Sequence, residues 1–359
     1  MGPLPRHLLK ACRDALPSLA VGAVGGALFV LIGMPLAWML GSMVLVAAVA
    51  LAGGARRMPM RVPARLREVM VAIIGVMLGS AFRPDMIDRA GEWAGLIALM
   101  LLYVPLVTAL CYGVFRWLGR LDPVTSYFSA TPGGLQEMTL IGEHYGGDAR
   151  SIVLTHAIRI FVVVMTVPVY FRFIEGLSVP SMAPGMHLAD MPLKEAALLV
   201  GAGIAGWFGA SFLRIPAARL VGPMLASGAV HLAGLSHAQP PPELVAVAQV
   251  VMGTALGCRF AGADWRAIGR IAGLAFLSTL IMLAVSLGLT LGAAGLVGAP
   301  TRALMLVLSP GGLAEMSLVA LALGVDVAIV SSMHVFRIVV VVILAPVAFR
   351  LSRLKRSGG

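Results

Sequence analysis

Charged residues are scarce in this sequence. They make up 12% of its 359 residues, whereas a soluble globular chain has roughly 25%. Hydrophobic residues make up 59%, and the mean hydropathy is +0.96. A chain this long with so little charge cannot cover its surface with polar groups, so we expect lipid to be its solvent. The composition therefore excludes an ordinary soluble protein and predicts an all-α polytopic membrane protein.

Cysteines and recognisable catalytic motifs are also few. Cys12, Cys111 and Cys258 stand alone, without metal or redox spacing. The histidines lack zinc or copper spacing. We find no phosphate-binding loop, dinucleotide fingerprint or nucleophile elbow. We therefore expect no cofactor, no metal and no enzymatic activity, and the missing nucleotide motif argues against a primary pump.

Basic residues are present, with a net charge of +11, but they do not form a nucleic-acid site. They lie in short loops and near both ends, as the positive-inside rule describes. No basic stripe interleaved with aromatic residues is present. We expect the lipid bilayer, and not a nucleic acid, to be the partner of this chain.

The chain contains one unit twice. Four segments recur at a separation of 178 residues, and a further segment near the start recurs at 181, where Pro35 and Gly41 match Pro216 and Gly222. The positions matched at 178 are Gly75/Gly253, Gly79/Gly257, Pro132/Pro310, Gly133/Gly311, Gly134/Gly312, Glu137/Glu315, Asp148/Asp326, His156/His334 and Arg159/Arg337. The duplication predicts a first membrane repeat at 1–173, a linker at 174–193 and a second repeat at 194–359.

Each half contains five apolar segments that could span a bilayer, and a short Pro-Gly-Gly segment before the last of them. The expected spans are 16–33, 35–53, 68–82, 93–116 and 150–172, then 196–212, 216–234, 243–260, 268–296 and 328–349. The Pro-Gly-Gly segments lie near 124–144 and 301–323.

Two topologies fit this pattern. If the Pro-Gly-Gly segments cross the membrane, the chain has twelve spans and parallel repeats. If they enter and return, it has ten spans and inverted repeats. Loop charges favour inversion, because that plan puts 20 of the 27 Lys and Arg residues inside, five outside and two in the membrane. We expect inverted repeats with both termini cytoplasmic in a bacterial inner membrane.

The Pro-Gly-Gly segments are candidates for a binding site. Proline removes a backbone donor, and irregular backbone at membrane depth is tolerated only against protein or a water-filled cavity. Paired breaks in two repeats point to a transporter site, although a simple helix kink would leave the same pattern. The first break is Pro132, Gly133 and Gly134, and the second is Pro310, Gly311 and Gly312.

Charged and titratable residues accompany each break. His156 and Arg159 are three residues apart on one helix face, as are His334 and Arg337. An arginine at the centre of a membrane helix costs roughly 2.5–3.5 kcal/mol, so it should face protein and pair. Glu137 and Glu315 are the natural partners. These groups would either form structural ion pairs, or hold an anionic substrate and relay a proton through histidine.

The remaining repeated residues have simpler interpretations. Asp148 and Asp326 precede the last span of each half, where we expect them to cap the helix. Gly75 and Gly79, with their counterparts in the second half, predict close helix packing.

The motif Pro-Gly-Gly-Leu-x-Glu-Met, followed by Gly-x-Asp and His-x-x-Arg in each half, resembles the AbrB-duplication family of bacterial membrane proteins. The resemblance covers almost the whole chain. Members of that family have been described as transcriptional regulators or as ammonia monooxygenases. The expected arrangement of two inverted repeats, each with a break, also resembles that of inverted-repeat symporters. One departure is Ala314, which stands where the first half has Gln136, so the two halves are not equivalent.

We expect a secondary transporter of a small solute, anionic on the evidence of the arginines, with H⁺ or Na⁺ as a coupling ion. Twelve residues would line its site: the two Pro-Gly-Gly triplets, together with Glu137, His156, Arg159, Glu315, His334 and Arg337. The alternative is a membrane protein that influences gene expression through a partner and does not bind DNA. A homo-oligomer is compatible with either.

Overall fold

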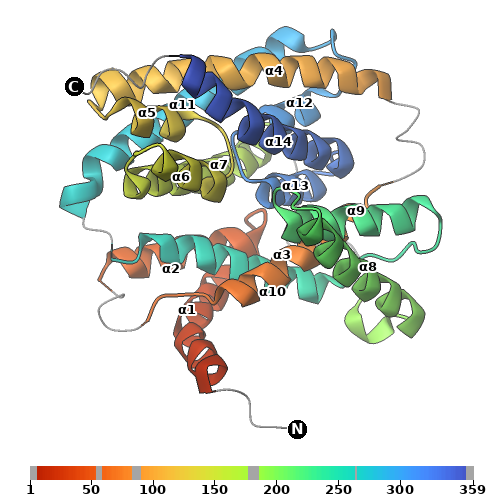
Figure 1. The fold of residues 1–359 in the computed structure, drawn as a ribbon. Coiled ribbons are helices and arrows are strands. Elements are labelled where there is room, and N and C mark those ends of the chain that lie inside the picture. Colours follow the sequence, from red (N-terminus) through yellow and green to blue (C-terminus); the bar gives the residue numbers. More distant parts are fainter. Residues whose placement is uncertain (1–5, 54–58, 83–89, 177–185, 263–264, 353–359) are drawn as a thin grey trace. The chain divides into compact units, whose positions relative to one another are not determined.

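The protein is all-helical. A computed structural model describes residues 6–53, 59–82, 90–176, 186–262 and 265–352, and in these ranges it has fourteen α-helices and no strand (Figure 1). The helices of the first half are α1 (Arg6–Leu31), α2 (Ala37–Leu51), α3 (Ala64–Gly79), α4 (Ala90–Gly113), α5 (Pro123–Ala130), α6 (Leu135–His144) and α7 (Ala149–Phe173). Those of the second half are α8 (Leu193–Phe212), α9 (Ala218–Leu232), α10 (Pro242–Gly257), α11 (Trp265–Ala293), α12 (Thr301–Leu308), α13 (Leu313–Ala322) and α14 (Val327–Leu351).

Three shorter helical segments complete the described secondary structure. A π-helical turn, η3 (Val114–Leu118), extends α4, and 3₁₀ turns occupy η4 (Leu188–Asp190) and η5 (Cys258–Phe260). Seven helical segments within the described residues are long and apolar enough to cross a membrane. The predicted class, an all-α polytopic membrane protein, is confirmed.

The helices group into two compact units, and each unit takes helices from both sequence halves. Unit 1 comprises residues 1–84, 167–263 and 321–328, and unit 2 comprises 85–166, 264–320 and 329–359. The predicted boundaries at 1–173, 174–193 and 194–359 therefore describe the duplication in the sequence and are not the boundaries of these units.

Close approach at repeated glycines determines the packing of unit 1. A Cβ added at Gly79 would lie 2.3 Å from the Met224 carbonyl oxygen of α9, and one added at Gly253 would lie 2.3 Å from the Met39 oxygen of α2. Without side chains at these positions, α3 packs directly on α9 and α10 on α2. The predicted packing role of these glycines is confirmed.

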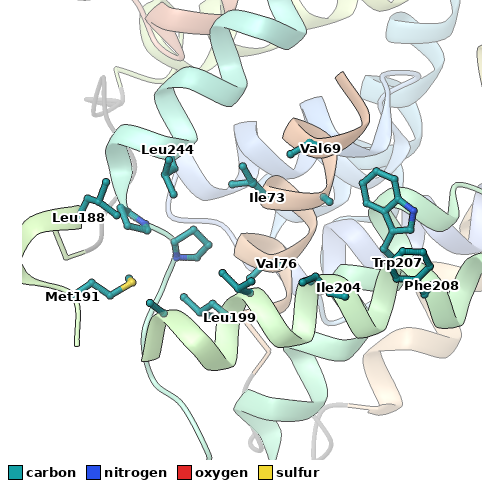
Figure 2. Close-up of a pocket in the computed structure, with 16 residues that line it drawn as sticks. Val69, Ile73, Val76, Leu188, Met191, Leu199, Ile204, Trp207, Phe208 and Leu244 are labelled. Atoms are coloured by element: carbon teal, nitrogen blue, oxygen red, sulfur yellow. The ribbon is translucent and has the colours of Figure 1, made fainter. Parts of the chain in front are cut away.

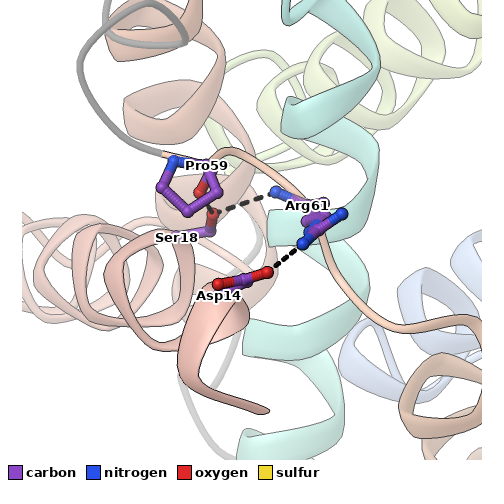
Figure 3. Close-up of polar contacts among 4 residues, drawn as sticks. All are labelled: Asp14, Ser18, Pro59 and Arg61. Carbon is purple, nitrogen blue, oxygen red and sulfur yellow. Dashed lines mark hydrogen bonds and ion pairs between the residues drawn. The ribbon is translucent and has the colours of Figure 1, made fainter. Parts of the chain in front are cut away.

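A polar cluster attaches α1 to the segment before α3 (Figure 3). Ser18 Oγ donates a hydrogen bond to the Pro59 carbonyl at 3.1 Å and accepts one from the Arg61 backbone N–H at 3.2 Å. The Arg61 guanidinium also pairs with the carboxylate of Asp14. These contacts fix where the chain enters α3.

The Pro-Gly-Gly segment of the first half is a helical hairpin in unit 2. Helices α5 and α6 have eight and ten residues, about 12 and 15 Å at 1.5 Å per residue, so each reaches about halfway through a 30 Å hydrocarbon core. They pack on each other, and Asp148 N–H, beyond the end of α6, donates to Thr125 Oγ1 in the first turn of α5 at 2.8 Å. The segment therefore ends beside its start.

Candidate functional site

The two Pro-Gly-Gly breaks, called tips below, are built by matching residues of the two repeats, and both lie in unit 2. Helix α5 stops before Thr131, which is extended, and Gly134 begins α6 without a side-chain cap. In the second repeat, α12 stops before Ser309 in the same extended conformation. Proline at the next position prevents the helix from continuing, so the last carbonyls of α5 and α12 are left without intrahelical donors.

A buried arginine in each repeat binds two carbonyls of the non-helical residues that follow α5 or α12. Arg159 donates from Nη1 to the Thr131 oxygen at 3.1 Å and from Nη2 to the Gly133 oxygen at 2.8 Å. Arg337 makes the same two bonds to Ser309 and Gly311, at 2.7 and 2.6 Å. Both arginines are almost completely buried. Each guanidinium thus bridges the break and places positive charge at the negative end of a half-helix.

The expected pairing of Arg159 with Glu137 is therefore wrong. Both guanidinium groups direct their Nη atoms to backbone carbonyls, and within the described part of unit 2 Arg159 forms no ion pair with Glu137. The broken backbone supplies the acceptors instead, because the residues between the two helices are not helical and their carbonyls receive no α-helical hydrogen bond.

Glu137 and Glu315 place negative charge at the start of the helix that follows each break. Glu137 lies in the first turn of α6, and its carboxylate folds back over Gly134, where an added Cβ would lie 2.1 Å from Oε2. The same distance separates a Cβ at Gly312 from Glu315 Oε2. An acidic residue here stabilises the positive end of a helix, and the second glycine of each motif leaves room for it.

The first glycine of each motif has a different neighbour. A Cβ at Gly133 would lie 2.7 Å from Met138 Cγ, and one at Gly311 would lie 2.7 Å from Met316 Cγ. The run Pro-Gly-Gly-Leu-x-Glu-Met therefore describes a compact tip: proline ends the helix, one glycine makes room for methionine, and the other makes room for glutamate.

The two histidines are fully buried in the same unit. His334 Nδ1 lies 2.9 Å from the Val330 carbonyl of its own helix, while Nε2 has no partner among the described residues. Neither ring nitrogen of His156 has one in the described ranges. The predicted residues are thus placed at or beside the two tips, with the arginines, the glutamates and both Pro-Gly-Gly segments engaged in local contacts.

Several buried polar atoms near these residues have no protein partner in the described part of unit 2. They are Nε of Arg159 and Arg337, Ser129 Oγ, Thr155 Oγ1 and Ser317 Oγ. Buried polar groups are normally hydrogen-bonded, and in lipid no other solvent can satisfy them. The atoms therefore indicate a polar centre. Sequence reasoning missed the three hydroxyls, because serine and threonine are common in membrane helices.

Positive charge is concentrated in this centre. Arg159 and Arg337 come from different repeats, yet they are close enough for their charges to repel, and the buried Tyr103 of α4 lies near both. Two buried cations that interact with carbonyl dipoles form a site suited to an anion.

Comparison with known proteins assigns the family. Residues 38–353 match the family model described as "Transition state regulatory protein AbrB". The chain belongs to the AbrB family. It is 25% identical over 354 residues to the "Uncharacterized protein YhjN" of Bacillus subtilis, covering 93% of this chain and 91% of that protein. It is 24% identical over 330 residues to the "Putative regulator AbrB" of Escherichia coli, covering 90% and 91%.

A groove in unit 2 of this AbrB-family chain reaches the first tip. It has a volume of about 450 Å³ and lies among α4, α5 and α14. Its lining is mostly apolar and includes four hydroxyl-bearing residues, Thr108, Tyr112, Tyr127 and Thr131. Thr131 is the residue whose carbonyl Arg159 binds. The groove therefore borders the residue directly before the first Pro-Gly-Gly.

Proposed function

We propose that this AbrB-family membrane protein is a secondary transporter of a small anion. Its solute site would lie in unit 2, between the tips of the two re-entrant hairpins, with the positive charge of Arg159 and Arg337 as its main attraction. Paired breaks in the two repeats are the usual setting of such sites.

The observation that carries this proposal is the pair of buried guanidinium groups. Each makes two bonds to neutral carbonyls, and each retains an unpartnered Nε among the described residues of unit 2. Burying like charges near each other is costly, and an anion bound between them would lower that cost. The unpartnered hydroxyls of Ser129, Thr155 and Ser317 are neutral donors for the same anion.

The division into two units is compatible with transport. Alternating access is commonly the movement of one rigid bundle against another around a site near the membrane midplane. Arg159 lies ten residues beyond the start of α7, about 15 Å along the helix, which is half of a 30 Å hydrocarbon core. The proposed topology has ten spans in a bacterial inner membrane with both termini cytoplasmic, and the proposed chemistry is binding and movement without catalysis.

Thermal unfolding of the purified protein tests the site. The probes are the sodium salts of acetate, succinate and phosphate at equal ionic strength, with choline replacing sodium to reveal a coupling ion. A bound anion at 100 times its Kd should stabilise the fold by about 2.7 kcal/mol. Thr155→Val should remove this stabilisation while leaving the unliganded midpoint nearly unchanged, because the Thr155 hydroxyl has no described partner.

A matched control separates the site from general stability. Thr279 of α11 is also fully buried, but its hydroxyl donates to its own helix at Ala275. Thr279→Val should therefore keep the response to the anion. The site proposal is wrong if an anion stabilises wild type and Thr155→Val equally, and the transport proposal is wrong if reconstituted protein moves no charge or label down a gradient of a stabilising anion.

The alternative function, regulation of gene expression through a partner, is supported by the name of the Escherichia coli relative, which contains the word "regulator". It predicts a cytoplasmic binding partner and a transcriptional phenotype that does not depend on the buried arginines. A strain with Arg159→Gln in place of the wild type separates the two: loss of transport with intact gene expression supports transport alone.

A further inference from the structure

A long apolar groove in unit 1 is unrelated to the hairpin tips. It has a volume of about 490 Å³ and lies between α3 and α8, closed at one end by η4 and the loop before α10 (Figure 2). Val69, Ile73 and Val76 of α3 face Leu199, Ile204 and Trp207 of α8 across it. Its size is that of a small-molecule pocket, but its lining offers almost no hydrogen-bonding group.

The groove is open along the outside of a membrane span. Its floor is buried at Ala72, Val76 and Leu199, whereas Val200 and Ile204 are 59% and 56% exposed. Both exposed residues belong to α8, one of the helices long and apolar enough to cross a bilayer. An apolar groove on such a face is in contact with acyl chains, so the ligand that fits it is a lipid tail.

The two ends of the groove differ in charge. At the Trp207 end, the Arg219 guanidinium lies 5.7 Å from the Trp207 ring centroid, and its Nε lies 2.9 Å from Glu68 Oε2. Arg65 and Arg67 lie in the first turn of α3, within a turn of Val69, and Arg214 follows α8 by two residues. Among the described residues of α3, α9 and the end of α8, this end therefore has four arginines and the carboxylate of Glu68.

The opposite end has the reverse balance. His187 Nδ1 lies 2.5 Å from Glu243 Oε1 at the surface. Asp190 and Glu195 are close in sequence to the lining residues Leu188, Met191 and Ala196. Lys194 is the fixed positive charge among the described residues 186–196. Only the Trp207 end is suited to an anionic headgroup.

We propose that unit 1 binds an anionic phospholipid, with one acyl chain in the groove between α3 and α8 and its phosphate at Arg219. Charge complementarity selects the headgroup, since each basic residue near a membrane surface contributes about 1 kcal/mol toward an anionic lipid. Arginine suits the phosphate because its planar fork can donate two hydrogen bonds. Trp207 fits the boundary between tail and headgroup, where amphipathic rings are enriched.

Native mass spectrometry of delipidated protein tests the proposal. The probes are dioleoyl phosphatidylglycerol and dioleoyl phosphatidylcholine, which have the same tails, and inorganic phosphate, which has no tail. We expect one tightly retained phosphatidylglycerol, weaker retention of phosphatidylcholine and no stabilisation by phosphate. Equal retention of the two lipids would overturn the headgroup assignment, and stabilisation by phosphate alone would show a soluble anion site.

Four variants locate the lipid. Val200→Trp should fill the groove and abolish retention, whereas Val247→Trp, at a 51% exposed valine on α10 outside the groove, should not. Arg219→Gln should weaken phosphatidylglycerol binding about fivefold. Glu68→Gln should strengthen it, because that change removes the carboxylate that Arg219 pairs with.

Arg219→Gln and Glu68→Gln break the same ion pair but should change lipid affinity in opposite directions, which distinguishes lipid binding from a general loss of stability. General destabilisation would weaken binding in both. Retention in Val200→Trp equal to wild type, or weakening in Glu68→Gln equal to that in Arg219→Gln, would refute the proposed site. Neither outcome bears on the anion site of unit 2.

Discussion

Replacing Arg159 by glutamine should open the first hairpin tip and leave the second closed. In the wild type, the Arg159 guanidinium holds the Thr131 and Gly133 carbonyls at 3.1 and 2.8 Å. The shorter, neutral glutamine amide cannot bridge both. The second tip depends on Arg337 and its own carbonyls, so it serves as an internal control in the same molecule.

The magnitude follows from the number of bonds lost. A hydrogen bond to a charged group contributes about 1.5–3 kcal/mol, so two such bonds give about 3–6 kcal/mol. Local opening of the tip leaves residue 159 in its helix. The free-energy cost of burying an arginine in the membrane is therefore nearly the same in the closed and the open tip, and it cancels from the difference between them. At 1.4 kcal/mol per tenfold, the population of the open tip should rise more than about a hundredfold.

Hydrogen exchange measured by mass spectrometry is the assay. The informative amides are those of Gly133, which bonds to the Thr131 carbonyl, and Met138, which bonds to the Gly134 carbonyl. Arg150→Gln, at an exposed arginine in the first turn of the same helix, should leave them protected. The reasoning is refuted if exchange at the first tip is unchanged, or if both tips accelerate equally, which would indicate global destabilisation.

Three further results are expected. Gly134→Ala should lower the free energy of unfolding by about as much as Glu137→Ala, roughly 0.5–1 kcal/mol. The double variant should lower it no more than either single change, because the methyl group added at Gly134 displaces the carboxylate that Glu137→Ala removes. Chemical denaturation of the two single variants and the double variant measures these values. Gly253→Ala should cost about 1–3 kcal/mol or more in the same assay, because its Cβ would meet backbone. The pKa of His187 is raised by its hydrogen bond to Glu243 and by the charge of that carboxylate. The ion pair should therefore weaken as the pH rises through the raised pKa of His187. NMR titration of Glu243→Gln should show a lower pKa for His187 than in the wild type.

Much of the fold was predictable from the sequence, because apolar length and duplication are properties of the chain alone. Spans expected at 150–172 and 328–349 are α7 (Ala149–Phe173) and α14 (Val327–Leu351). The caps were predictable for the same reason: Asp148 Oδ1 accepts from Arg150 N–H at 3.1 Å, and Asp326 Oδ1 accepts from Ala328 N–H at 3.1 Å. Local rules decide such features, so local patterns reveal them.

The partners of the arginines could not be read in the same way. Charge alone suggested Glu137 for Arg159, whereas the acceptors are the carbonyls of Thr131 and Gly133. Every residue has a carbonyl, so its presence is no signal. Which carbonyls are unsatisfied depends on where a helix breaks and on what the tip packs against. The grouping of helices into two units was hidden for a related reason, since it depends on contacts between the halves.

The repeated residues and the unrepeated ones suggest different roles in the polar centre. Arg159 and Arg337 make equivalent bonds in the two halves, so their repetition is explained by closure of the hairpins. The unpartnered hydroxyls of Ser129 and Thr155 have apolar counterparts, Val307 and Met333, at the 178-residue separation. Closure needs both tips, but an asymmetric solute needs donors on one side. We therefore expect changes at Ser129 and Thr155 to alter which anion binds, while changes at the arginines alter whether the tips hold.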